Sequence, residues 1–160
     1  MNETRTKALA CLALLIVLGV ALAAGRDPVS GSGSADALLF PDGTGTASGE
    51  ATLVIGGTTL NADVVVQIYE SYFRDEGVLH GVSSHTFDFG GGDEITTSDK
   101  VVGEFTGPPG LLTLNEKLTI VSGTGAYDGV SGDMTVHGQL QFTGPATAVV
   151  TYDIVGAISR

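Results

Sequence analysis

Chain-reversing clusters divide this sequence into short segments, and this punctuation constrains the fold more than any other feature. Six clusters that combine Gly with Pro, Asp or further Gly occur between residues 41 and 145, and these residue types favour tight turns. The segments between the clusters are rich in β-branched residues and lack a sustained apolar i, i+3, i+4 pattern, which would indicate a helix. The sequence therefore predicts an all-β domain.

Eight strands are expected between the turns. Their predicted ranges are 35–40, 49–55, 59–72, 78–89, 94–105, 111–121, 133–142 and 147–158. Short links between successive strands favour a small closed antiparallel eight-stranded barrel, in which no sheet edge stays unpaired. A parallel βαβ fold is excluded, because no segment of helical period is long enough for the crossovers. The length of 160 residues suits one such domain with one core.

The first 23 residues have the layout of a secretory signal peptide that forms a helix. Arg5 and Lys7 precede an apolar stretch over residues 8–24, and Ala21 and Ala23 supply the small side chains that signal peptidase needs. We predict cleavage after Ala23 and a secreted or periplasmic mature protein. An uncleaved N-terminal membrane anchor is the alternative, because a stretch of about 17 residues is at the lower limit for crossing a bilayer.

Residues 24–34 are expected to form a flexible leader, because they contain the Gly/Ser run of residues 30–34. The predicted organisation is thus a signal peptide over 1–23, a leader over 24–34 and a β-barrel domain over 35–160. Cys11 is the only cysteine and lies inside the apolar stretch. The mature protein would therefore have no disulfide, no thiol nucleophile and no thiolate metal ligand.

The acidic character of the chain limits its partners. The formal net charge is −11, whereas nucleic acid requires a positively charged surface. We therefore expect no nucleic-acid partner and no stable membrane association after cleavage, since anionic lipid is disfavoured for the same reason. The acidity is explained by solubility, with cation binding as the alternative.

Alternation of side chains along the strands indicates which residues face the interior. In the strand predicted at 78–89, one face contains Leu79, Gly81, Ser83, His85, Phe87 and Phe89. That face is expected to lie in the core, with His80 on the opposite face. In the strand at 111–121, Glu116 lies on an otherwise apolar face, and in the strand at 133–142, His137 is expected to face solvent.

The C-terminal half resembles the allene oxide cyclase and dirigent barrels. In residues 116–132, EKLTIVSGTGAYDGVSG, a strand ends in a glycine-rich turn with an aromatic residue, as in those families. The final strand, with VTYDIVG at 150–156, and the aromatic-rich SHTFDFG at 84–90 are also similar. The resemblance covers residues 80–158 and implies the closed barrel. It does not imply allene oxide cyclase activity, because residues 35–72 have no counterpart of the acidic, Asn-containing strand of the plant cyclases.

Glu116, His85 and Tyr127 are the candidate catalytic residues. A carboxyl group on an apolar barrel face would have a raised pKa and could exchange a proton near neutral pH. Glu116 could instead lie at the barrel rim, and His85 could be a packed core histidine. No metal site is predicted, because His80 and His85 project to opposite faces, and no cofactor is expected, because the glycines from Gly123 onward precede no helix.

Two functions are compatible with these residues. The first is a barrel that binds a small hydrophobic molecule and acts as a cofactor-independent isomerase or cyclase by holding the molecule in one conformation. The second is a non-catalytic extracytoplasmic structural or interaction module, which would form a homo-oligomer. An interior cavity above about 300 Å3 with Glu116 or His85 pointing into it would favour the first function.

Overall fold

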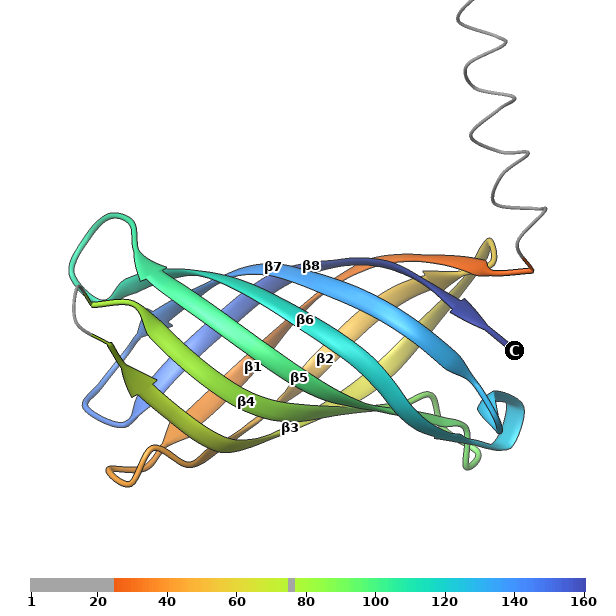
Figure 1. Cartoon of the computed structure of the whole chain (residues 1–160), viewed down its shortest axis with the longest axis horizontal. Coiled ribbons are helices and arrows are strands. Elements are labelled where there is room, and N and C mark those ends of the chain that lie inside the picture. Colours follow the sequence, from red (N-terminus) through yellow and green to blue (C-terminus); the bar gives the residue numbers. More distant parts are fainter. Residues whose placement is uncertain (1–24, 75–76) are drawn as a thin grey trace, which may run out of the picture.

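The computed structural model describes residues 25–74 and 77–160, which form a closed antiparallel barrel of eight strands (Figure 1). The strands are β1 (Asp27–Leu39), β2 (Gly45–Ile55), β3 (Thr58–Phe73), β4 (Leu79–Asp88), β5 (Glu94–Phe105), β6 (Leu111–Thr124), β7 (Ser131–Phe142) and β8 (Thr147–Ser159). Each strand pairs with the next in sequence and β8 pairs with β1, so the predicted fold class is confirmed. The predicted signal peptide lies outside the described residues. Within the described ranges, no helix is long and apolar enough to span a membrane.

The predicted flexible leader is wrong for the Gly/Ser run. Residues 30–34 lie in β1 and pair with both β2 and β8. The glycines of the run point inward and the serines outward. Only glycine fits at position 33, because a Cβ there would lie 2.6 Å from the Tyr152 hydroxyl. A composition typical of linkers therefore encodes a strand whose inward-facing residues must be small.

Small residues line one wall of the barrel interior. An eight-stranded barrel normally has an interior just wide enough for side chains to fill it. From residue 31 to 37 on β1 and from residue 45 to 51 on β2 every inward position is glycine or alanine, namely Gly31, Gly33, Ala35, Ala37, Gly45, Ala47, Gly49 and Ala51. The opposite wall contributes larger side chains, such as Leu114 on β6. The mismatch leaves room for a cavity beside β1 and β2.

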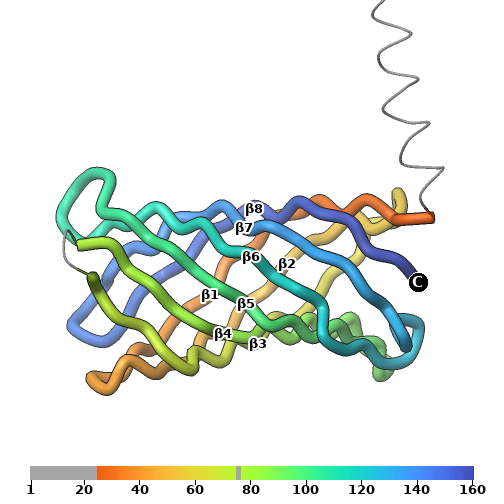
Figure 2. Tube along the Cα trace, viewed as in Figure 1, coloured from red at the N-terminus to blue at the C-terminus, as the bar shows by residue number. Residues whose placement is uncertain are grey.

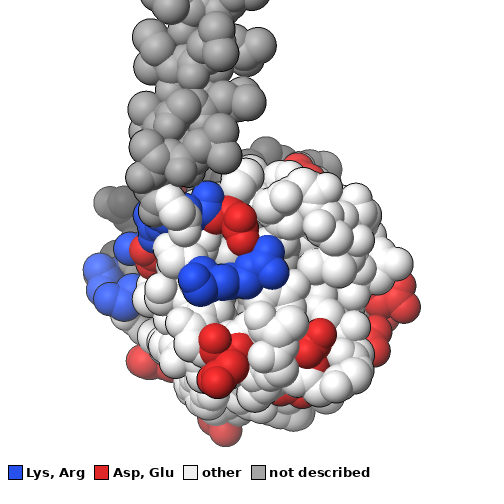
Figure 3. Space-filling model, turned by 90° about the vertical axis from the view of Figure 1, so that its right-hand side faces the viewer, with Lys and Arg blue, Asp and Glu red and all other residues white. Residues whose placement is uncertain are grey.

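The two ends of the barrel differ. The end at the right of Figure 1 holds residue 25 and the C-terminus, as the trace in Figure 2 also shows. There a short 3-10 helix, η1 (Gly125–Tyr127), places Tyr127 against Phe89 with the ring centroids 4.9 Å apart. Arg160 lies over the Tyr127 ring and pairs with Asp27 at 2.8 Å. We call this the closed end; Figure 3 faces it and shows basic side chains gathered there, with acidic ones around them.

The opposite end carries exposed aromatic side chains. Phe73 at the end of β3 stacks on Phe105 at the end of β5, with centroids 5.7 Å apart, and both rings are about half exposed. Leu39 and Phe142 lie at the ends of β1 and β7 on the same side of the barrel. We call this end the mouth, because the interior cavity extends to Leu39, Phe73 and Phe142.

Candidate functional site

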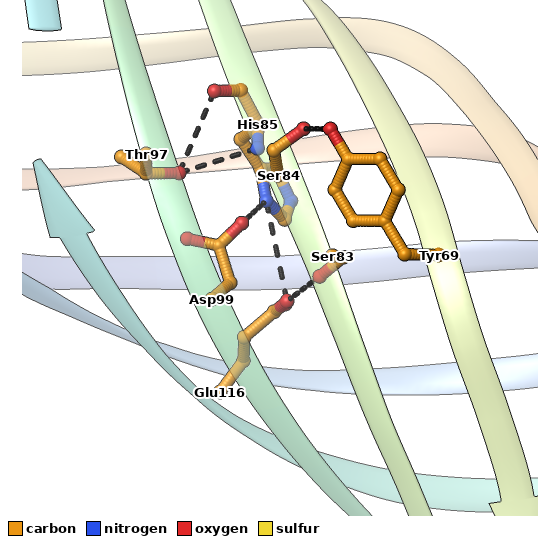
Figure 4. Close-up of polar contacts among 7 residues, drawn as sticks. All are labelled: Tyr69, Ser83, Ser84, His85, Thr97, Asp99 and Glu116. Carbon is orange, nitrogen blue, oxygen red and sulfur yellow. Dashed lines mark hydrogen bonds and ion pairs between the residues drawn. The ribbon is translucent and has the colours of Figure 1, made fainter. Parts of the chain in front are cut away.

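Three ionisable side chains meet inside the barrel. His85, Asp99 and Glu116 project inward from the neighbouring strands β4, β5 and β6 (Figure 4). His85 Nδ1 lies 2.9 Å from Asp99 Oδ2 and 4.0 Å from Glu116 Oε1. The three side chains are 7%, 0% and 9% exposed, respectively. We refer to these three residues as the interior cluster.

Hydrogen bonds from neighbouring residues position the interior cluster. The Ser83 hydroxyl donates to Glu116 Oε1 at 2.7 Å. The β4–β5 pairing is interrupted beside His85, and the His85 backbone N–H instead donates to the Thr97 hydroxyl at 3.2 Å. The His85 ring stacks on Phe87 with centroids 5.8 Å apart. The imidazole and the Glu116 carboxyl group are therefore held in place by packing and polar contacts, as a catalytic group requires.

Burial and mutual attraction set the protonation of the interior cluster. Burial raises the pKa of the Glu116 carboxyl group, and the opposing effects of His85 and the Ser83 hydrogen bond do not cancel this rise. Burial alone would lower the pKa of His85, but the hydrogen bond to Asp99 and the charges of Glu116 and Asp99 more than offset it, so that the pKa is raised. Both groups therefore hold protons more tightly than they would in water, which suits proton exchange near neutral pH.

His85 and Glu116 of the interior cluster line an apolar cavity of about 140 Å3 that extends to the mouth. Its walls include Ala35, Ala37, Ala47, Val66, Leu114, Val136, Leu140 and Val150. The polar groups on the walls, Ser83, His85, Glu116 and Tyr152 among them, are few. The volume is below the roughly 300 Å3 that we set as support for ligand binding, whereas the expected orientation of Glu116 and His85 is observed. A dry cavity of about 150 Å3 is large enough to hold benzene.

The structure brings together two of the three candidate catalytic residues. Glu116 is buried inside the barrel and not at its rim, and His85 is both packed in the core and part of the cavity wall. Tyr127 lies in η1 at the closed end and does not line the cavity. His80 stacks on Tyr72 with ring centroids 5.8 Å apart, and His137 is exposed as predicted.

Sequence reasoning missed Asp99 and Tyr152, although the signal that found Glu116 was present for both. On β5, Asp99 alternates with Ile95 and Val101, so it shares their inward face. On β8, Tyr152 lies between the inward positions of Val150 and Ile154. A polar residue on an otherwise apolar strand face is the common feature of all these positions.

The interior cluster is also the group within the described ranges whose atoms could surround a metal ion. One ligand atom from each of the three residues lies within 4.8 Å of the others. However, His85 Nδ1 already has Asp99 at hydrogen-bonding distance, and Glu116 Oε1 already accepts from Ser83. These contacts are those of a hydrogen-bonded acid and base pair, and we interpret the cluster in that way.

Comparison with known proteins assigns this chain to no family. No protein-family model and no curated protein sequence matches this chain. Among solved structures, a pterocarpan synthase dirigent protein is similar to it, with 16% sequence identity and a TM-score of 0.40, over 84% of this chain and 89% of that protein. At this level of similarity no function is transferred from that protein. What is established for this chain is a closed eight-stranded barrel with a buried acid and base cluster on the wall of an apolar cavity.

Proposed function

We propose that the barrel binds a small apolar molecule in its interior cavity and catalyses a cofactor-independent isomerisation or cyclisation by proton transfer at Glu116. The observation that carries this proposal is the position of a buried carboxyl group, paired with a buried imidazole, on the wall of an apolar cavity. Ionisable groups are rarely buried in this way unless they are paired or functional. A filled barrel that served only as an interaction module would have no need of them.

The chemistry follows from the environment of Glu116. The carboxylate is a stronger base than a free carboxylate, because its pKa is raised by burial. A proton taken from a bound molecule would be held at Glu116. The positive charge of His85, whose Nδ1 lies 4.0 Å from Glu116 Oε1, would balance the negative charge left on the molecule. Return of the same proton to another atom of that molecule completes an isomerisation without an external reactant. Apolar walls would hold the molecule in one conformation and exclude water.

The Kemp elimination of 1,2-benzisoxazole tests this proposal without knowledge of the natural substrate. A base removes the ring C–H proton while the N–O bond breaks, and the product is 2-hydroxybenzonitrile. We expect the protein to accelerate this reaction and Glu116→Gln to lower the rate about 100-fold, the lower range for general base catalysis. The rate should rise with pH through a midpoint above 4.5, the ordinary carboxyl pKa, because the pKa of Glu116 is raised.

Glu104→Gln is the matched control, because Glu104 is an exposed glutamate on β5. Its rate should equal that of the unmodified protein, and circular dichroism should show that both variants are folded. A rate no higher than that of acetate at equal concentration, or equal rates for Glu116→Gln and Glu104→Gln, would overturn the catalytic proposal. The non-catalytic module would then be the better explanation of the fold.

A further inference from the structure

The Tyr152 hydroxyl lacks a hydrogen-bond partner inside the barrel. Tyr152 projects inward from β8 and its side chain lines the same cavity as Glu116. The hydroxyl oxygen is buried, and within residues 25–74 and 77–160 it has no hydrogen-bond partner. A buried hydroxyl without a partner destabilises the fold. Such a group is retained against a continuous cost, which points to a use outside the fold itself.

The neighbouring strands explain where this hydroxyl points. Tyr152 lies opposite Gly33 on β1 and Gly138 on β7. Its ring packs directly over Gly33, since a Cβ at that position would lie 2.7 Å from the Tyr152 Cζ atom. The next inward residue on β1, Ala35, offers no acceptor. The two glycines make room for the ring, whose hydroxyl end lies over Gly33.

Tyr152 is a hydrogen-bond donor at every pH at which the protein is expected to work. Burial, with a smaller contribution from the charge of Glu116, raises the pKa of the Tyr152 hydroxyl to about 12. The hydroxyl therefore keeps its proton and favours an oxygen acceptor on a bound molecule. A carboxylate acceptor is disfavoured, because Glu116 already contributes negative charge to this side of the cavity.

We infer that Tyr152 binds the carbonyl oxygen of the substrate, and that the cavity takes small apolar ketones or aldehydes in preference to hydrocarbons of the same shape. This inference rests on the proposed function and names its substrate class. When Glu116 removes a proton from the carbon beside a carbonyl group, negative charge develops on the carbonyl oxygen. A fixed donor at that oxygen stabilises the charge where it forms.

A pair of probes of equal shape tests the inference. Acetophenone and α-methylstyrene differ only in that a C=O group of the first is a C=CH2 group in the second. We expect Tyr152→Phe to weaken acetophenone binding about fivefold, the value of one hydrogen bond, and to change α-methylstyrene binding less than about twofold. Ligand-observed NMR titration gives the four dissociation constants, and comparison of variants for each probe cancels the difference in probe hydration.

Tyr69→Phe is the matched control, because Tyr69 is an exposed tyrosine on β3 that bonds Ser84 on the outer face. It should change the binding of neither probe. If the unmodified protein bound neither probe, both the proposed function and this inference would fail. If both probes bound and Tyr152→Phe left acetophenone binding unchanged, or weakened both equally, only the role of Tyr152 would be refuted.

Discussion

Substitution of Gly49 by alanine is expected to destabilise the barrel more than any other single methyl group. Gly49 lies opposite Ala35 in the β1–β2 pairing. A Cβ at Gly49 would overlap the Ser34 carbonyl oxygen and would approach the Ala35 Cα to 2.6 Å. Because both contacts are with backbone atoms, no side chain can move to relieve them, and β1 would have to shift away from β2. We expect a loss of about 3 kcal/mol in the free energy of unfolding.

Thermal and urea denaturation of Gly49→Ala provide the measurement, with a fall in Tm of about 10 °C expected for a domain of this size. Gly107→Ala is the matched control, because Gly107 lies in a turn where a Cβ would only touch the Leu111 side chain at 3.5 Å. Its stability should stay within about 0.5 kcal/mol of the unmodified protein. Equal stabilities for the two variants would mean that β1 and β2 lie farther apart at Gly49 than in this structure.

Replacement of His85 by leucine is expected to cost about 3–5 kcal/mol, the range for a buried ion pair that loses one partner. Asp99 and Glu116 would remain buried without their imidazole partner. His137→Leu is the control, because His137 is an exposed histidine that bonds Asn115 on the outer face. It should change stability by less than about 0.5 kcal/mol.

The effect of His85→Leu should depend on pH in a direction set by the raised pKa of His85. A group whose pKa is raised by folding stabilises the folded state below its unfolded pKa of 6.5, and this contribution is lost as pH rises through the folded pKa. The difference in stability between the unmodified protein and His85→Leu should thus be largest near pH 6 and smaller at alkaline pH. Urea denaturation at several pH values would show this; a difference that grows with pH would contradict the assigned protonation.

The sequence was most informative where alternation and turn chemistry agreed. The strand predicted at 94–105 has the observed bounds of β5. The predicted inward faces of β4 and β6 are also confirmed, and they include His85 and Glu116. These predictions succeeded because period-two patterning and tight turns are local properties of the chain.

The predictions are wrong where tertiary contacts, not local sequence, determine the structure. The sequence predicts a leader over residues 27–34, since glycine and serine favour flexible linkers, yet these residues form a strand because β2 and β8 pair with both of its edges. Tyr127 is a candidate from the sequence, but it lies in η1 at the barrel end remote from the mouth and does not line the cavity. Which inward polar residues meet depends on strand register across β4, β5 and β6, which no single strand encodes.

A crystal structure of the protein soaked with iodobenzene would test most directly whether the interior is an accessible apolar cavity beside a buried acid. We expect an anomalous iodine peak inside the barrel, between the small wall at Ala47 and the larger side chain of Leu114, with Glu116 and His85 buried next to it. An interior filled by side chains with no iodine peak, or Glu116 turned out to solvent, would contradict both the cavity and the chemistry assigned to it.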